Sequence, residues 1–305
     1  DLQEHYLPRI PAWVGHMTQL QSLNLSENCL EELPDTLSRL VQLKELKLEN
    51  NVLKKLPDWI GEFKKLEVLT LSHNELEDLP TSITMLKNLR YFSLEHNKLQ
   101  KLPEGLPRLK HITKLDLSDN QLSDLPDSIG DMTQLKELDL RNNRFQVLPS
   151  TITKLTNLEV LWLSDNQLHT LADWIGNLSK VKRIYLSNNQ LPTLPPSFSK
   201  LKQLQMLYLH NNQLQALPEA LKNMSKLSYI DLDENQLEEL PDWISNWKNL
   251  EELRVHHNPI EALPPSLVLL PKLTTLRIEG CPFADSKGVA AANSRDEILA
   301  LFSAL

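Results

Sequence analysis

Apolar and polar residues follow a pattern that repeats along this chain every 23 residues. In the stretch from Leu43 to Lys65, every second residue around Leu46 and Leu48 is apolar. Alternation of this kind predicts a short strand whose leucines point inward. Because the segment recurs in each period, we expect the strands to lie side by side in a parallel sheet, with one strand from each coil of a stacked-repeat architecture.

One asparagine closes the strand phrase of each period without a slip. The positions are Asn28, Asn51, Asn74, Asn97, Asn120, Asn143, Asn166, Asn189, Asn212, Asn235 and Asn258. We expect each amide to hydrogen-bond the backbone of its own and of the next coil, because peptide groups buried at a turn otherwise stay unpaired. We therefore interpret these residues as a structural ladder rather than as ligands.

The return arm of most coils opens with a proline, as at Pro57. Proline fixes φ and cannot continue a strand, so we expect turns or short 3-10 or α segments on the side opposite the sheet. Ile60 and Phe63 then anchor that segment to the core.

The complete phrase, L-x-x-L-x-L-x-x-N-x-L-x-x-L-P-x-x-[IL]-x-x-L, resembles the 23-residue class of leucine-rich repeat. This class occurs in Scribble-like and Ras-suppressor-like scaffolds, plant intracellular Ras-group-related proteins and many bacterial proteins, and the match covers residues 10–282. The resemblance implies an α/β repeat fold, a right-handed leucine-rich-repeat solenoid of horseshoe shape, with a concave parallel sheet and convex 3-10 or short helical segments. It also implies protein–protein recognition and nothing narrower.

We expect the domain organisation to follow the repeats. Residues 1–19 would form an N-terminal cap and partial repeat in which Tyr6 and Trp13 cover the first coil, and residues 20–282 would form twelve repeats. Cys281 replaces the ladder asparagine in the last coil, so the solenoid ends there. Caps are needed because a bare terminal coil exposes apolar core.

Residues 283–305 are predicted to contain the C-terminal capping helix. Ser294 to Glu297 has the form of a capping box. The apolar residues that follow at helical spacing are Ile298, Leu301, Phe302 and Leu305. They should cover the last coil, although a partner-binding helix is the alternative.

Two columns of strand residues flank the inward leucines and are expected to face the concave surface. In coils seven to ten these columns carry large side chains, whereas most earlier coils carry small, polar or charged ones. The candidate partner-binding residues are Val160, Trp162, Arg183, Tyr185, Met206, Tyr208 and Tyr229, with a charged rim that includes His210, Asp231 and Arg254. Trp, Tyr, Met and Arg are enriched at interface centres. The alternative is that these side chains merely pack on one another.

A third column brings His210, Asp233 and His256 onto successive strands, with His257 beside them. Zinc accepts imidazole and carboxylate ligands. No cysteine or clear second shell accompanies these residues, so we predict a polar rim without a metal ion or cofactor, and a metal centre is the alternative.

The net charge of −8 argues against a reader of duplex nucleic acid and against a polybasic membrane binder. The sequence has no run of 18 apolar residues, so we do not expect a membrane span. Cys29 and Cys281 should lie about 50 Å apart at about 4.8 Å per strand, too far for a disulfide. Animal extracellular solenoids of this class usually carry Cys-clustered caps, which this sequence lacks. We therefore expect a cytoplasmic protein, with a secreted bacterial protein as the alternative.

The sequence contains none of the common catalytic motifs that bind phosphate or activate a nucleophile, and we do not expect an enzyme. We predict a monomeric signalling scaffold that binds a partner protein through coils seven to ten. One alternative is the recruiting module of a larger enzyme, which a start at Asp1 rather than Met allows. Another is a glycan or small-molecule receptor, because aromatic rings on a concave wall also suit sugars.

Overall fold

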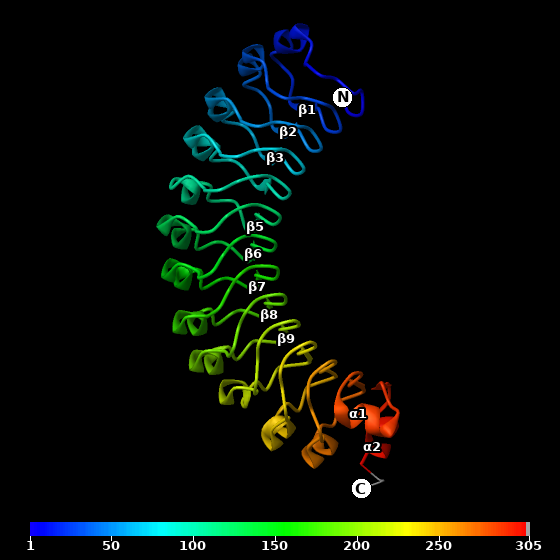
Figure 1. Cartoon of the computed structure of the whole chain (residues 1–305). Helices are drawn as coiled ribbons and strands as arrows, with labels where there is room; N and C mark the ends of the chain where they lie inside the picture. The colour runs from blue at the N-terminus through cyan, green and yellow to red at the C-terminus, as the bar shows by residue number, and fades with distance from the viewer. Residues whose placement is uncertain (303–305) are drawn as a thin grey trace. The chain divides into compact units, whose positions relative to one another are not determined.

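The computed structural model describes residues 1–302, and Figure 1 traces the chain from blue at the N-terminus to red at the C-terminus. The chain divides into two compact units, residues 1–155 and the residues from Thr156 onwards. In each unit, short parallel strands lie on one side and 3-10 segments on the other (Figure 1). The predicted α/β repeat fold is confirmed.

In the first unit, the strands of successive coils pair in parallel, from β1 with β2 to β5 with β6. The strands are β1 (Ser22–Asn24), β2 (Glu45–Lys47), β3 (Val68–Thr70), β4 (Tyr91–Ser93), β5 (Lys114–Asp116) and β6 (Glu137–Asp139). The 3-10 segments are η1 (Ala12–His16), η2 (Asp35–Arg39), η3 (Asp58–Glu62), η4 (Thr81–Met85), η5 (Leu106–Arg108), η6 (Asp127–Asp131) and η7 (Ser150–Lys154).

The second unit repeats this arrangement and then changes at its C-terminal end. Its parallel strands are β7 (Val160–Trp162), β8 (Arg183–Tyr185), β9 (Met206–Tyr208), β10 (Tyr229–Asp231), β11 (Glu252–Arg254) and β12 (Thr275–Arg277). Its 3-10 segments are η8 (Asp173–Asn177), η9 (Pro196–Lys200), η10 (Glu219–Leu221), η11 (Asp242–Asn246) and η12 (Pro265–Leu269). Helix α1 (Pro282–Lys287), the antiparallel strand β13 (Ala291–Ala292) and helix α2 (Arg295–Ala300) follow.

The core of each coil is formed by the residues that the alternation marks as inward. Leu46 and Leu48 are buried, as are Ile60 in η3 and Phe63 directly after it. The strand side and the 3-10 side of a coil therefore meet on one apolar layer. The opposite side of the strands, here called the open sheet face, carries the residues that alternate with these leucines.

Asn143 shows the hydrogen bonding of the asparagine ladder. Its Oδ1 accepts the backbone N–H of Leu122 at 3.0 Å, and its Nδ2 donates to the carbonyl oxygen of Leu117 at 2.9 Å. The same Nδ2 also donates to the carbonyl oxygens of Leu140 and Arg141. The ladder is confirmed with one correction: the neighbour that it bridges is the preceding coil, because the peptide groups of Leu117 and Leu122 face the amide.

The residue before each ladder asparagine adopts a left-handed backbone conformation that the sequence analysis did not anticipate. The φ angles run from 49° at Asn142 to 58° at Asp165. Asn, Asp and His, which tolerate this region best among non-glycine residues, occupy most of these positions. In the last coil the position is Gly280, with φ of 69°, where a Cβ would overlap the imidazole of His257.

The N-terminal cap differs from its prediction. Tyr6 and Trp13 are 77% and 55% exposed, so they do not cover the first coil. Instead, Ile10 and Val14 are buried, and the backbone of residues 2–7 hydrogen-bonds to the segment that begins at β1. These hydrogen bonds pair polar backbone groups that the first strand would otherwise leave open at the edge of the sheet.

The C-terminal helix begins at the predicted capping residue. The Oγ of Ser294 accepts the backbone N–H of Glu297 at 3.2 Å, while the Glu297 carboxylate reaches one residue further back, to the N–H of Asn293 at 2.8 Å. Ile298 is buried as expected, and Leu305 lies outside the described residues. Helix α1 and strand β13 were not predicted. The proposed domain boundaries stay predictions.

Among the described residues, no helix combines the length and the apolar composition that a membrane span requires.

Candidate functional site

The aromatic side chains of the candidate site come from adjacent strands in direct register. Trp162 on β7 pairs with Tyr185 on β8, and Tyr185 pairs with Tyr208 on β9. The neighbouring residues Leu161 and Ile184 are fully buried in the core. Because successive strand residues point to opposite faces, the rings stand on the open sheet face.

These rings form a continuous stack. The centroids of Trp162 and Tyr185 lie 5.6 Å apart with an interplanar angle of 11°, and those of Tyr185 and Tyr208 lie 4.4 Å apart at 13°. Tyr229, in the neighbouring column of β10, leans on Tyr208 with a centroid distance of 4.7 Å and a tilt of 36°. We call these four residues the aromatic ladder. All four are half-buried, so they are neither core residues nor fully solvated.

The structure places most of the predicted site residues on this face. Arg183 is exposed, and Met206, His210 and Arg254 are half-exposed. Two predicted site residues are buried instead: Val160 is 2% exposed and Asp231 is 9% exposed. The short side chain of Val160 lies beside the longer Arg183 of β8.

Val160 therefore cannot serve as a contact residue, and its assignment to the surface was wrong. Its strand partner on β8 is the long Arg183, and Trp162 follows two residues later on the same face. Glu252, by contrast, was left out of the predicted site although it is the half-buried strand partner of Tyr229. Its position two residues before Arg254 was the sequence signal that could have identified it.

A charged network borders the ladder. The Nε and Nη2 atoms of Arg254 both lie 2.9 Å from Oδ2 of Asp233, and Nε lies 3.9 Å from Oδ2 of Asp231. Burial, with the adjacent charge of Asp233, raises the pKa of Asp231. Burial alone would lower the pKa of Arg254, but its hydrogen bond to Asp233 and the two carboxylate charges outweigh this and raise it.

The tyrosines next to this network hold their protons more tightly than a solvated phenol. Burial raises the pKa of Tyr208 to about 12, and the adjacent Tyr185 adds to the shift. Burial, followed by the charge of Asp231, also raises the pKa of Tyr229. At neutral pH Tyr208 and Tyr229 therefore present neutral hydroxyl groups that can donate hydrogen bonds.

A group of possible metal ligands lies within this network. His210, Asp231 and Asp233 each offer one atom, and these atoms lie within 4.8 Å of one another. The set differs from the predicted one, because Asp231 takes the place of His256. Arg254 already occupies the cation position beside both carboxylates, so a metal ion would have to displace it. The arrangement is better suited to an ion-pair network than to a metal centre.

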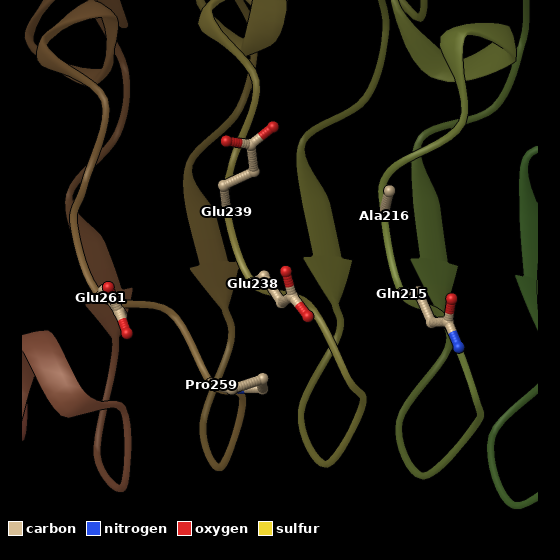
Figure 2. Close-up of a pocket in the computed structure, with 6 residues that line it drawn as sticks. All are labelled: Gln215, Ala216, Glu238, Glu239, Pro259 and Glu261. Atoms are coloured by element: carbon tan, nitrogen blue, oxygen red, sulfur yellow. The ribbon is translucent and has the colours of Figure 1, made fainter.

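A hollow lies on a flank of the second unit. It has a volume of about 510 Å³, and Figure 2 shows Glu238, Glu239 and Glu261 around it, with Gln215 and Pro259. No basic side chain stands among the residues that line it. Exposed carboxylates of this kind are satisfied by water and counter-ions, so the hollow does not by itself indicate a ligand.

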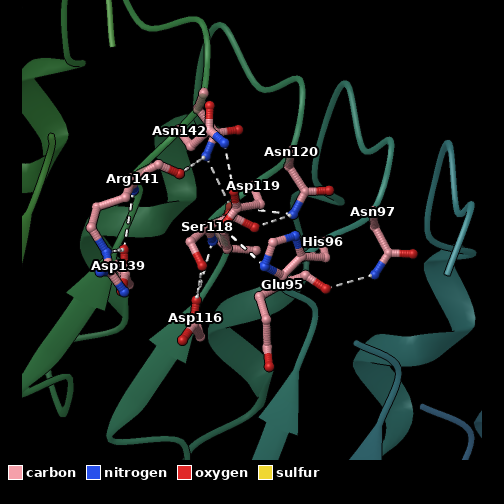
Figure 3. A network of polar contacts seen from close by, with 12 residues as sticks. Glu95, His96, Asn97, Asp116, Ser118, Asp119, Asn120, Asp139, Arg141 and Asn142 are labelled. Atoms are coloured by element: carbon pink, nitrogen blue, oxygen red, sulfur yellow. Dashed lines mark hydrogen bonds and ion pairs between the residues drawn. The ribbon is translucent and has the colours of Figure 1, made fainter. Parts of the chain in front are cut away.

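On the open sheet face of the first unit, polar side chains of β5, β6 and the turns that follow them bind one another (Figure 3). The Nη2 of Arg141 lies 2.6 Å from Oδ2 of Asp139, and Ser118 donates to the carboxylate of Asp116 at 2.7 Å. Burial raises the pKa of Asp139, and its hydrogen bonds from Arg141 oppose the shift. Because these groups already bind one another, they offer a partner less than the aromatic ladder does.

Comparison with known families and structures agrees with this architecture. A sequence profile described as leucine rich repeat matches residues 11–53, 56–99, 172–214, 193–237 and 216–260, and a leucine-rich repeat region profile matches residues 81–183. Proteins of curated function give no match.

Solved structures extend the comparison to most of the chain. A leucine-rich-repeat protein of Leptospira interrogans shares 34% identity with a TM-score of 0.87, over 97% of this chain and 74% of that one. The plant peptide hormone receptor RGFR1, in complex with RGF2, shares 32% identity with a TM-score of 0.72, over 88% of this chain and 46% of the receptor chain. An internalin from Listeria monocytogenes, at 22% identity and a TM-score of 0.67 over 87% of this chain and 82% of its own, shares the fold.

The profiles cover more than half of the sequence, and the repeat spacing, the asparagine ladder and the strand register agree with that match. This chain belongs to the leucine-rich repeat family.

Proposed function

We propose that this chain is a protein-interaction module that binds a partner protein through the open sheet face of the second unit, centred on repeats seven to ten. The observation that carries the proposal is the aromatic ladder: four large rings from successive strands stand half-exposed on a face where the core does not use them.

The composition of the surface supports this proposal. Tyr, Trp, Met and Arg bury much area at interface centres for little loss of conformational entropy. The rings also restrain one another by stacking, so less freedom remains to be lost when a partner binds. Leu161 and Ile184 already fill the core beneath them, so removal of the rings leaves the apolar layer intact.

The comparison with solved structures supports the same class of function. RGFR1 is a peptide hormone receptor whose structure holds its ligand RGF2, and this chain spans less than half of that receptor's length. We transfer from it only the general property of binding a polypeptide.

The ring geometry disfavours the glycan alternative. Sugars stack on exposed ring faces, but both faces of Tyr185 are covered, by Trp162 on one side and by Tyr208 on the other. Tyr185, at the centre of the aromatic ladder, therefore offers its ring edge and hydroxyl group, which suit the peptide groups and side chains of a protein partner.

The other predictions from the sequence carry over as part of the proposal. We infer a non-catalytic scaffold that acts as a monomer in the cytoplasm without nucleic acid or cofactors. Cys281 fits this inference, since its buried thiol donates to the carbonyl oxygen of Val255 at 3.1 Å, as a ladder asparagine would.

A triple variant tests the proposed surface. Trp162→Ala, Tyr185→Ala and Tyr208→Ala together should abolish capture of the partner from an extract of the native source. The Tm should fall by no more than about 3 °C, because the core is untouched. The matched control removes the same three side-chain types from exposed positions in the first unit, as Tyr6→Ala, Trp13→Ala and Tyr91→Ala.

Proteins captured by the wild type and by the control, but lost with the site variant, are the expected result. If the site variant captures the same proteins, the surface is assigned wrongly. If its Tm collapses, the ladder belongs to the fold rather than to a binding surface.

A further inference from the structure

One column of the open sheet face has opposite charges at its two ends. Arg183 on β8 pairs in register with Met206 on β9, Met206 pairs with Tyr229 on β10, and Tyr229 pairs with Glu252 on β11. The column therefore reads cation, apolar, aromatic, anion across successive strands. It runs beside Tyr208 of the aromatic ladder.

The two end charges stand outside the ion pairs of the part of the chain that the structure describes. Neither Arg183 nor Glu252 forms an ion pair among the residues that the structure describes. By contrast, Lys182 pairs with Glu159 at 2.6 Å, and Arg254 pairs with Asp233 at 2.9 Å. Arg183 is exposed and Glu252 is half-buried at the border of the ladder. Both charges are thus accessible to a partner and are not already neutralised.

The register fixes the distance between these charges. Three strand spacings separate β8 from β11, and at about 4.8 Å for each spacing the two positions lie about 14 Å apart. Met206 and Tyr229 fill the interval with apolar surface.

We propose that the partner docks here as an extended peptide segment that crosses the strands, an inference that rests on the proposed function. The segment has an acidic side chain over Arg183, a basic side chain over Glu252 four residues away, and an apolar side chain midway between them. An extended chain advances about 3.3 Å per residue with alternate side chains on one face, so positions i, i+2 and i+4 span about 13 Å on the docking side.

A helical segment does not match this spacing. In an α-helix, residues i and i+7 share one face after about two turns, and residues i and i+11 share it after about three turns. Because the rise is about 1.5 Å per residue, these pairs lie about 10 Å and about 16 Å apart. The 14 Å interval falls between the two, whereas an extended segment fits it.

The test is a selection from random 12-residue peptides displayed on phage, panned against the full chain. Each enriched peptide is then synthesised and titrated by fluorescence anisotropy against the wild type, Arg183→Glu, Glu252→Lys and the ladder triple variant. Lys226→Glu and Glu238→Lys, exposed positions away from the open sheet face, are the matched charge reversals.

We expect enriched peptides with an acidic and a basic residue four positions apart. Arg183→Glu should weaken their binding by about fivefold or more, as for a partly exposed charge pair. Reversal of the peptide's acidic residue to lysine should restore binding to Arg183→Glu, and the control reversals should leave binding within about twofold.

Other outcomes separate the two proposals. One contrary result is a set of peptides that bind only when the aromatic ladder is intact, yet bind equally to Arg183→Glu and Glu252→Lys. That result, or peptide charges at helical spacing, overturns the extended-segment inference and leaves the proposed function standing. Peptides that bind the ladder triple variant as well as the wild type, or the lack of any enrichment above that variant, overturn both.

Discussion

The guanidinium of Arg254 hydrogen-bonds the carboxylate of Asp233 across two adjacent coils, with Nε and Nη2 both 2.9 Å from Oδ2. The other oxygen of that carboxylate accepts the backbone N–H of His256 at 2.8 Å. Asp231 stands beside Asp233 and contributes a second buried negative charge. Arg254 is therefore the cation that allows two carboxylates to share this part of the open sheet face.

Replacement of Arg254 by methionine should destabilise the second unit by about 1–2 kcal/mol at pH 7. Breaking a fully buried ion pair costs about 3–5 kcal/mol, but the Arg254 side chain is 35% exposed, so solvent screening reduces the loss. Chemical denaturation measures the change. Arg183→Met removes an exposed arginine without an ion pair among the described residues and should change the unfolding free energy by no more than about 0.5 kcal/mol.

The same substitution should have a pH dependence of defined sign. The pKa of Asp231 is raised in the folded protein, so its favourable contribution is full below the unfolded pKa of about 3.9 and is lost as pH rises through the folded pKa. The deficit of Arg254→Met should thus be larger at pH 7 than at pH 4. An equal deficit at both values would show that charge repulsion between Asp231 and Asp233 is not the cause.

Asn143→Ala should lower the unfolding free energy by about 1–3 kcal/mol, because the N–H of Leu122 and the carbonyl of Leu117 lose their partner. Asn88→Ala is the matched control. Its amide also bonds a carbonyl of the preceding coil, that of Lys64 at 2.7 Å, but in an exposed position where water can replace it. Equal denaturation curves for wild type and Asn143→Ala would contradict the structural role of the asparagine ladder.

Features that obey a local rule in every coil could be predicted from the sequence. Leu46 and Leu48 point inward because strand residues alternate, and Asn143 bonds backbone because each turn needs the same partner. The burial of Val160 could not be predicted in this way. It depends on the size of side chains on neighbouring strands, such as Arg183, and not on the pattern within its own strand.

The elements after the last repeat were missed for a related reason. Helix α1 has no periodic apolar signal, since it spans only Pro282–Lys287. Two local signals could have identified it: Pro282 at the first helical position and Gly288 at its C-terminal end, where φ is 67°. Of the candidate site, the aromatic ladder was predicted correctly as a surface feature because all its members lie at equivalent strand positions.

The two thiols should differ in reactivity toward an aromatic disulfide reagent. Cys29 is exposed and should react at once, whereas Cys281 should react only after unfolding. Burial raises the pKa of Cys281, which lowers its thiolate fraction. Its thiol also donates a hydrogen bond to the carbonyl oxygen of Val255. The variant Cys29→Ser should therefore show no rapid reaction in buffer and one reactive thiol in denaturant. Rapid reaction of this variant in buffer would mean that the last coil opens in solution.

Stability should fall in alkaline solution because of the tyrosines of the ladder. An unfolded tyrosine ionises near pH 10, whereas the pKa of folded Tyr208 is about 12. Tyr208 therefore contributes stability that is complete below about pH 10 and is lost as pH rises through about 12. In Tyr208→Phe this loss should be smaller than in the wild type, with the remainder due to Tyr229, whose pKa is raised in the same direction.

Chemical denaturation of the wild type and of Tyr208→Phe at pH 8 and pH 11 measures the difference. The tyrosinate absorbance of Tyr208→Phe should lack a component that titrates near pH 12 in the wild type. Tyr6→Phe, which removes a hydroxyl from a residue that is 77% exposed, is the matched control. If the component missing from Tyr208→Phe titrates near pH 10 instead, Tyr208 is solvated, and the stacked ladder is not the rigid surface that the proposed binding requires.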